Sequence, residues 1–418
     1  MATARRAPPG RLSRRLTFLF AATAGAAVGN LYWTQPLLGL IAGDLRSATA
    51  TAGWLVTATQ IGYAVGVLLL VPLGDVLDRR RFVPLMLTFS AAALLLCAWA
   101  PSIGMLLAAL GVLGLTTISG QVLTPLAGDL AGDDHRGRVV GVVGSGTLTG
   151  ILASRTISGL VADVAGWRAI FVVAAVVAIL LAVLLHRAIP PLPPRTRLAY
   201  PRLVASVGAV VARERAVRWT LVLAATGFAT FSLFWTALTF LLSGPPFGYP
   251  APVIGLFGLA GLAGVLAGLR GGRLHDRGWS LPAAGAAWAL ALAAFAVAAV
   301  AGRSVVLVVV AVVMVDVALQ TQALFNRARL FALSDDARSR LNTALAASNF
   351  VGAAAGSAAA TTLWAIGGWT AITIAGAALC CFALTVWALG RRGPLVVRPA
   401  VDAGRQSSGE PGLTRPVS

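Results

Sequence analysis

The amino-acid sequence predicts an all-α integral membrane protein with twelve transmembrane helices. Three properties of the 418-residue chain support this fold class: a mean hydropathy of +0.85, a hydrophobic fraction of 58% and a charged fraction of only 11%. A helix needs about 20 mostly apolar residues to cross a hydrocarbon core about 30 Å thick. The alternation of apolar and polar residues that a membrane β-barrel requires is missing from these stretches.

Twelve stretches meet the length requirement for a spanning helix. They occupy residues 17–40, 52–72, 83–100, 103–127, 138–162, 167–187, 219–242, 251–271, 280–301, 304–327, 339–363 and 369–389. The first follows a basic run, Arg5 to Arg15, that resembles the start of a signal peptide. Its apolar region is too long for a signal peptide and eleven further stretches follow, so we expect an uncleaved first helix.

The arginines predict the orientation of these helices. The chain has no Lys, and 29 of its 33 Arg fall in the two tails and in the connections on one side of the predicted topology. The exceptions are Arg46, Arg168 and Arg303 on the other side and Arg155 within a stretch. This asymmetry predicts that both termini are cytoplasmic. The net charge of +19 is therefore explained without a nucleic-acid partner, since no basic segment is interleaved with exposed aromatic residues.

Short motifs recur after about 200 residues and predict an internal repeat. The sequence DDHRGR at 133–138 returns as DDARSR at 335–340, and GWRAIF at 166–171 returns as GWTAIT at 368–373. Two six-helix repeats in parallel orientation account for this pattern. We therefore expect a cytoplasmic tail (1–16), a six-helix bundle (17–187), a cytoplasmic linker (188–218), a second six-helix bundle (219–389) and a cytoplasmic tail (390–418).

A charged motif, PLGDVLDRRRF at 72–82, follows the second predicted helix. Its glycine permits a tight turn, and Asp78 can pair with nearby arginines or cap a helix amino terminus. Together with the twelve stretches, this motif resembles the signature of the major facilitator superfamily, a glycine followed after three residues by an aspartate and basic residues. The matching positions are Gly74, Asp78, Arg79 and Arg80, with a second, degenerate copy at Gly272, Asp276 and Arg277. An arginine at position 81 departs from the usual glycine.

The resemblance implies that this cluster, with Arg138 on the next connection, latches two halves together on the cytoplasmic side. The stretch NLYWTQPLLGLIA at 30–42 is also similar to bacterial members of the family named as drug or sugar efflux proteins. Among the uncharged polar and aromatic side chains of the spans, we select as candidates for a binding site Asn30, Tyr32, Trp33, Gln35, Gln121 and Gln320. Hydrogen bonding between helices is the alternative role for such residues. An aromatic group in the seventh span faces either a ligand or lipid: Phe228, Phe231, Phe234 and Trp235.

Two ionisable residues lie well within predicted spans, Arg155 and Asp316. Such a group costs about 2.5–3.5 kcal/mol at the centre of a spanning helix, so each should face a cavity or a partner. Neither is duplicated, because Ser357 and Gly114 stand at the corresponding positions of the other repeat. We therefore expect both to handle substrate or ions, with Asp316 carrying a proton. A static ion pair with Arg155, or a hydrogen-bonded structural acid, is the alternative for Asp316.

These features predict a secondary active transporter that works by alternating access, with proton-coupled efflux of small amphipathic organic compounds as the leading hypothesis. Proton-coupled uptake or facilitated transport of a small polar nutrient such as a sugar is the alternative, and a membrane enzyme or scaffold is a remote one. Without any lysine the chain cannot form an ATP-binding P-loop. We expect no catalytic residues, cofactor or metal. The expected partners are a small-molecule substrate, protons and the lipid bilayer, for a monomer in a bacterial inner membrane.

Overall fold

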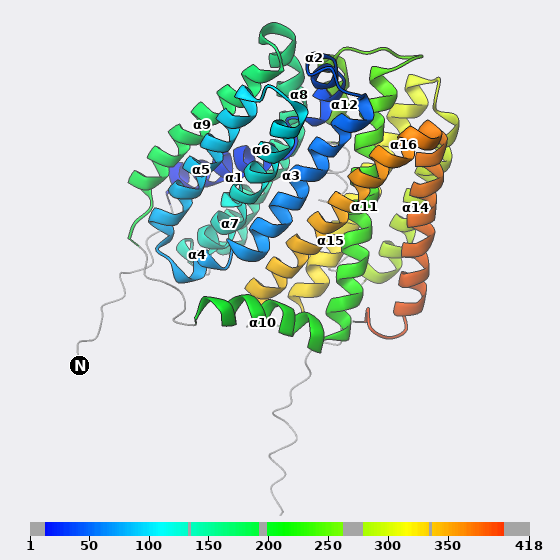
Figure 1. The fold of residues 1–418 in the computed structure, drawn as a ribbon. Helices are drawn as coiled ribbons and strands as arrows, with labels where there is room; N and C mark the ends of the chain where they lie inside the picture. Colours follow the sequence, from blue (N-terminus) through cyan, green and yellow to red (C-terminus); the bar gives the residue numbers. More distant parts are fainter. Residues whose placement is uncertain (1–12, 133–134, 192–198, 262–278, 334–336, 397–418) are drawn as a thin grey trace, which may run out of the picture.

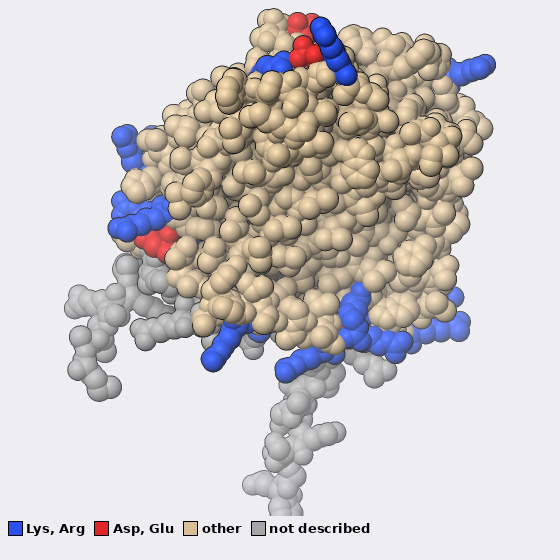
Figure 2. Space-filling view, in the orientation of Figure 1, with Lys and Arg blue, Asp and Glu red and all other residues tan. Residues whose placement is uncertain are grey.

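The computed structural model describes residues 13–132, 135–191, 199–261, 279–333 and 337–396, and these parts are all-helical. The helices form one bundle (Figure 1). We call its two ends the α2 end, after α2 (Leu38–Asp44), and the α10 end, after α10 (Tyr200–Arg213). The face in view has a broad central area without charged side chains, which gather at its margins (Figure 2). Such a belt suits a surface in contact with lipid.

The amino-terminal group of helices comprises α1 to α9. Besides α2, these are α1 (Arg14–Gly29), η1 (Gln35–Leu37), α3 (Thr49–Leu69), α4 (Leu73–Val76), α5 (Arg79–Trp99), α6 (Ile103–Thr116), α7 (Ser119–Leu130), α8 (Arg136–Ala165) and α9 (Trp167–Ala188). The carboxyl-terminal group comprises α11 (Arg215–Ser243), α12 (Ala251–Ala260), α14 (Ser280–Val300), α15 (Val305–Phe331) and α16 (Arg338–Gly390). Side-chain oxygens accept hydrogen bonds at the amino termini of four of these helices and so fix where they begin: Ser13, Asp78, Ser102 and Ser304.

Nine helices within the described residues are long and apolar enough to cross a membrane. The prediction of an all-α membrane protein is confirmed, whereas the count of twelve spans stays a prediction. The predicted spans 339–363 and 369–389 are two helices joined as α16 at Gly368, whose φ of 56° only glycine adopts readily. The predicted span 251–271 begins as α12, and its residues after 261 lie outside the described part.

The predicted spans 17–40 and 103–127 each contain a local break in the helix, although Ile103–Leu130 together remain long and apolar enough to cross a membrane. The first break runs from Asn30 to Thr34, before Pro36, whose missing N–H cannot continue a helix. The second lies at Thr117, between α6 and α7. The two breaks meet: Asn30 Nδ2 donates to Thr117 Oγ1 (3.0 Å), and Thr117 Oγ1 donates to the carbonyl of Ala27 (2.8 Å). That carbonyl has lost its helical donor, since the amide of Leu31 bonds to Val28 instead. Polar side chains thus satisfy the backbone that the breaks expose.

Helix α8 packs on α1 in the same register as α16 packs on α11. A Cβ added to Gly150 would lie 2.1 Å from the carbonyl oxygen of Gly25, and one added to Gly352 would lie 2.1 Å from that of Ala225. Gly352 comes 202 residues after Gly150, and Ala225 comes 200 residues after Gly25. One turn earlier the corresponding close contacts are Gly146 to Ala21 and Ser348 to Leu221. Only glycine or another small residue permits helices to approach this closely.

Contacts between the two groups run along two seams. Helix α3 packs along α16, and α8 packs along α12. At the α2 end, Gly53 of α3 lies against Thr361 of α16 and the ring of Phe240 of α11. The linker between the groups contains α10, which lies across the end of the bundle (Figure 1). The buried Val207 of α10 packs with α11, α15 and α16 in one apolar cluster.

Candidate functional site

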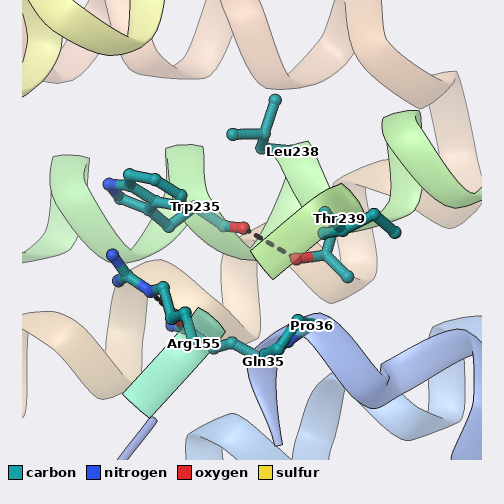
Figure 3. Close-up of a pocket in the computed structure, with 7 residues that line it drawn as sticks. Gln35, Pro36, Arg155, Trp235, Leu238 and Thr239 are labelled. Atoms are coloured by element: carbon teal, nitrogen blue, oxygen red, sulfur yellow. Dashed lines mark hydrogen bonds between the residues drawn. The ribbon is translucent and has the colours of Figure 1, made fainter. Parts of the chain in front are cut away.

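The Arg155 side chain of α8 is buried in the middle of the molecule, with 2% of the residue exposed. Its Nε donates to Oε1 of Gln35 in η1 (2.9 Å), and its Cζ lies 3.9 Å from the ring centroid of Trp235 in α11. Figure 3 shows the guanidinium beside the face of this ring. The rings of Tyr32 and Phe231 lie 5.2 and 5.6 Å away. A buried guanidinium is thus stabilised by one hydrogen bond and by cation–π contacts.

Asp316 of α15 is also buried, with 3% exposed. Its Oδ1 accepts a hydrogen bond from Nε1 of Trp235 (3.2 Å), and Oδ2 lies close to the backbone of Gly261 at the end of α12. No direct salt bridge joins Arg155 and Asp316. The same indole contacts both, with its face toward the cation and its N–H toward the carboxylate. The two ionisable residues are therefore connected through Trp235, and the predicted alternative of a direct ion pair is not formed.

A small pocket lies next to Arg155. Its empty volume of about 220 Å³ includes space open to solvent, so the enclosed part is smaller than this figure. Residues from four segments, η1, α8, α11 and α12, line it: Gln35, Pro36, Arg155, Trp235, Leu238, Thr239 and Ile254 (Figure 3). The pocket combines apolar walls with a single charged side chain. Its size indicates that the helices are drawn together around the site in this conformation.

The structure brings some of the predicted site residues together and separates others. Tyr32 and Gln35 lie beside Arg155, as described above. Asn30 and Trp33 bond to each other, with Trp33 Nε1 donating to Asn30 Oδ1 (2.9 Å), and so hold the break that follows α1. Gln121 instead donates to the hydroxyl of Tyr63 (3.1 Å), and neither Gln121 nor Gln320 lines the pocket. Of the predicted set, Gln121 and Gln320 therefore lie apart from the buried arginine.

The aromatic group of the seventh span faces the protein interior. Phe231 and Trp235 contact Arg155, while Phe234 packs on Phe295 with centroids 5.8 Å apart and Phe228 packs on Phe350 at 5.9 Å. None of the four side chains is exposed. The alternative that these residues face lipid is therefore wrong.

A second polar cluster joins three helices from both groups. Gln60 of α3 donates through Nε2 to Ser232 Oγ in α11 (3.1 Å) and accepts through Oε1 from Ser357 Oγ in α16 (3.2 Å). Thr57 Oγ1 lies 2.7 Å from the same Ser357 oxygen. A glutamine within a span is a visible sequence signal. The two serines give no such signal, because serine is common in spanning helices as a small packing residue.

In the charged motif at the α10 end, Asp78 caps α5 rather than pairing with an arginine, since its Oδ1 accepts from the backbone N–H of Arg80 (2.9 Å). Arg79 is buried and donates through Nε to the carbonyl of Gly74 (2.9 Å). It also pairs with two carboxylates that the motif does not single out, Asp129 of α7 at 3.2 Å and Asp75 at 3.9 Å. The capping alternative for Asp78 is the one formed.

Among the described residues, Asp75 of this motif contacts the other group of helices. Ser339 Oγ at the start of α16 donates to Asp75 Oδ2 (3.5 Å). Arg80 donates to the carbonyl of His186 (3.3 Å), and Arg138 is exposed on α8. The second copy of the motif, Gly272, Asp276 and Arg277, lies outside the described residues.

A third charged cluster, at the α2 end, was not predicted. Asp44 accepts hydrogen bonds from Trp167 Nε1 (3.0 Å) and from Arg168, whose Nη2 also donates to the carbonyl of Ala100 (3.1 Å). The hydrogen bonds from Arg168 and Trp167 hold the pKa of Asp44 below its ordinary value of 3.8. This cluster ties α2 to the start of α9 and the end of α5.

Comparison with known proteins gives consistent matches. A family model described as Major Facilitator Superfamily matches residues 16–328. The uncharacterized transporter YgaY of Escherichia coli O157:H7 is 38% identical over 380 residues, which cover 91% of this chain and 96% of that protein. Among solved structures, a mutant of the nucleoside transporter NupG superposes with a TM-score of 0.74 at 14% identity over 90% of this chain and 99% of that one. The human organic anion transporter MFSD10 gives 0.68 at 17% identity over 91% and 100%. At these identities the solved structures show a shared fold.

Proposed function

The chain belongs to the Major Facilitator Superfamily, and from this premise we propose that it is a proton-coupled secondary active transporter of small amphipathic organic compounds, working by alternating access. Export is the leading direction, because residues 30–42 resemble efflux members of the family. The observation that carries the proposal is the buried series Arg155, Trp235 and Asp316. The indole of Trp235 on α11 contacts the cation on α8 through its ring face and the carboxylate on α15 through its N–H.

The electrostatics of this series suit proton coupling. With Asp316 ionised, the two charges compensate each other across the interface between the groups; with Asp316 protonated, the charge of Arg155 has no counterpart in the site. The carboxylate is buried away from water and accepts a hydrogen bond from Trp235, so its charge is only partly compensated there. The attraction between α8 and α15 is therefore stronger when Asp316 is ionised than when it is protonated. A ligand or proton shifts a conformational equilibrium only through such a difference.

We further propose twelve spans in two six-helix repeats, 17–187 and 219–389, joined by the linker 188–218. The matched register of α8 on α1 and of α16 on α11 supports this arrangement. The arginine asymmetry supports cytoplasmic tails, 1–16 and 390–418, in a bacterial inner membrane. The α10 end is then cytoplasmic. There the motif around Arg79 is proposed as a gate, with the contact between Asp75 and Ser339 as its crossing point.

A second candidate is uptake of a small polar nutrient such as a sugar, by proton coupling or facilitated transport. The cluster of Gln60, Ser232 and Ser357 favours it, because uncharged amides and hydroxyls suit a ligand rich in hydroxyl groups. A membrane enzyme or scaffold remains remote, since the family consists of transporters.

Proton flux in proteoliposomes tests the proposal. Purified protein is reconstituted with an internal pH dye, and a panel of amphipathic drugs, sugars and amino acids is added under imposed pH gradients of both signs. We expect substrate-triggered proton movement that is lost in Asp316→Asn and kept in the control Asp163→Asn, an exposed carboxylate on α8. Flux without proton movement, or flux unchanged in Asp316→Asn, would refute the coupling. The direction of substrate movement separates export from uptake.

A further inference from the structure

Two buried hydrogen-bond donors in the site have no partner. They are Arg155 Nη2 and Gln35 Nε2, on residues that are 2% and 1% exposed. Buried donors are almost always paired, because leaving one unpaired costs its full desolvation. Gln35 Oε1 already accepts from Arg155 Nε (2.9 Å), so the amide and the guanidinium are fixed relative to each other. Their free donors therefore form a preset pair rather than two independent defects.

Both residues line the pocket described above, and its other walls favour a particular ligand. Arg155 is the sole charged residue among those that line it, and Pro36, Leu238 and Ile254 supply apolar surface. Asp316, the acidic member of the series, does not line the pocket and instead accepts a hydrogen bond from Nε1 of Trp235 (3.2 Å). The pocket thus offers one positive charge, two donors and an apolar wall.

We infer that this pocket binds the carboxylate of an organic monoanion whose apolar part lies against Pro36, Leu238 and Ile254. The inference rests on the proposed transport function and specifies its substrate class. Two carboxylate oxygens match two donors, one of them on a guanidinium, which is a strong and directional arrangement. A cation would be repelled by Arg155, and a neutral hydroxyl would bring no negative charge to offset that of the guanidinium. A phosphate dianion would bring a second negative charge that no other cation in the pocket lining offsets.

Asp316 gives this assignment a distinctive consequence. An ionised Asp316 and a bound carboxylate compete for the charge of one guanidinium, so the anion binds best when Asp316 carries a proton. Substrate and proton then bind together rather than in exchange. If carboxylate binding is confirmed, we therefore expect the flux assay to show substrate and proton moving inward together rather than export of substrate in exchange for a proton.

Binding to the purified full-length protein in detergent tests the inference without requiring transport. The probes are acetate, 3-phenylpropionate and 1-naphthoate, each compared with its primary amide, and 3-phenylpropylamine as the matched cation. Affinity is read from the concentration dependence of the thermal unfolding midpoint. We expect at least one carboxylate to bind roughly 10- to 100-fold more tightly than its amide, which corresponds to hydrogen bonds with a charged group, and the amine not to bind.

Four variants locate the effect. Arg155→Gln should reduce the preference for carboxylate over amide to about one, and the exposed control Arg303→Gln should leave it intact. Gln35→Glu places a carboxylate beside Arg155 with little change of shape, so it should abolish the preference even if Arg155→Gln fails to fold. Asp316→Asn should tighten carboxylate binding and leave amide binding unchanged, a result that a purely structural role would not produce.

Equal binding of acid and amide across the series, or a preference that survives both Arg155→Gln and Gln35→Glu, would overturn the inference and leave the two donors hydrated. The proposed function can fail separately. Selective carboxylate binding without proton-coupled flux would uphold the inference and refute the coupling, whereas proton-coupled flux of neutral compounds alone would do the reverse.

Discussion

Gly53 of α3 is the position where a single methyl group should open the α2 end. A Cβ built there lies 2.2 Å from Thr361 Oγ1 and 2.9 Å from Phe240 Cζ. Ordinary contact begins at 3.4 Å, so the hydroxyl must recede by 3.4 − 2.2 = 1.2 Å. Rotation of Thr361 does not relieve the clash, because its own Cβ is 3.1 Å away and its hydroxyl donates to the carbonyl of Ser357 (2.9 Å). The helices α3 and α16 must separate instead.

Overpacking of this kind costs about 1–3 kcal/mol. Because the cost falls on the conformation in which α3 and α16 meet at the α2 end, Gly53→Ala should shift the ratio of closed to open molecules roughly 5- to 150-fold toward open. The control is Gly104→Ala in α6, whose added Cβ meets nothing within 4 Å.

Double electron–electron resonance can measure this shift. Spin labels at Ala48→Cys and Arg303→Cys lie at the α2 end on the two groups, in a Cys381→Ser background that removes the exposed cysteine. We expect a longer-distance population in Gly53→Ala and an unchanged distribution in Gly104→Ala. If the two variants give the same distances, close packing at Gly53 does not hold this end shut and the reasoning is refuted.

Three further predictions follow from other contacts. Trp235→Phe removes the N–H that bonds Asp316 and should lower proton-coupled flux by about tenfold, while Trp99→Phe, on an exposed ring, should not. Because hydrogen bonding lowers the pKa of Asp44 in the folded protein, its stabilising effect is present above pH 3.8 and is lost as the pH falls through the lower folded value; thermal unfolding of Asp44→Asn should therefore show a weaker acid dependence than wild type. Gly352→Leu should abolish monodisperse folded protein in size-exclusion chromatography, whereas Gly141→Leu, where nothing lies within 4 Å, should be tolerated.

The sequence predicts the membrane helices well where composition alone decides them. The predicted span 167–187 is α9 to within one residue, because its charge-free apolar run, 169–185, is flanked by Arg168 and Arg187 and leaves little choice of boundary. The break before Pro36 has a sequence signal, since proline cannot donate to a helix. The break at Thr117 has none: threonine is tolerated inside helices, and what stops α6 there is a hydrogen bond to Ala27, about 90 residues away in the chain.

The candidate site shows the same division. Arg155 and Asp316 are evident from the sequence because an ionisable residue in a span is costly. That Trp235 connects them depends on how α11 packs between α8 and α15, which no local pattern encodes. In the charged motif, spacing identifies Asp78 and Arg79, but Arg79 also pairs with Asp75 on α4 and with Asp129 on α7, the latter 50 residues away in the chain.

The close backbone contacts of α8 on α1 and of α16 on α11 have a mechanical consequence. Where backbones touch, no long side chains lie between the helices to absorb a displacement, so we expect each pair to move as one rigid body. In each pair, one helix also contacts the opposite group: α8 packs against α12, and α16 packs against α3. If one group rotates relative to the other, each of these helix pairs rotates as a unit along its contact with the opposite group. The displacement at the α2 end then determines the displacement at the α10 end.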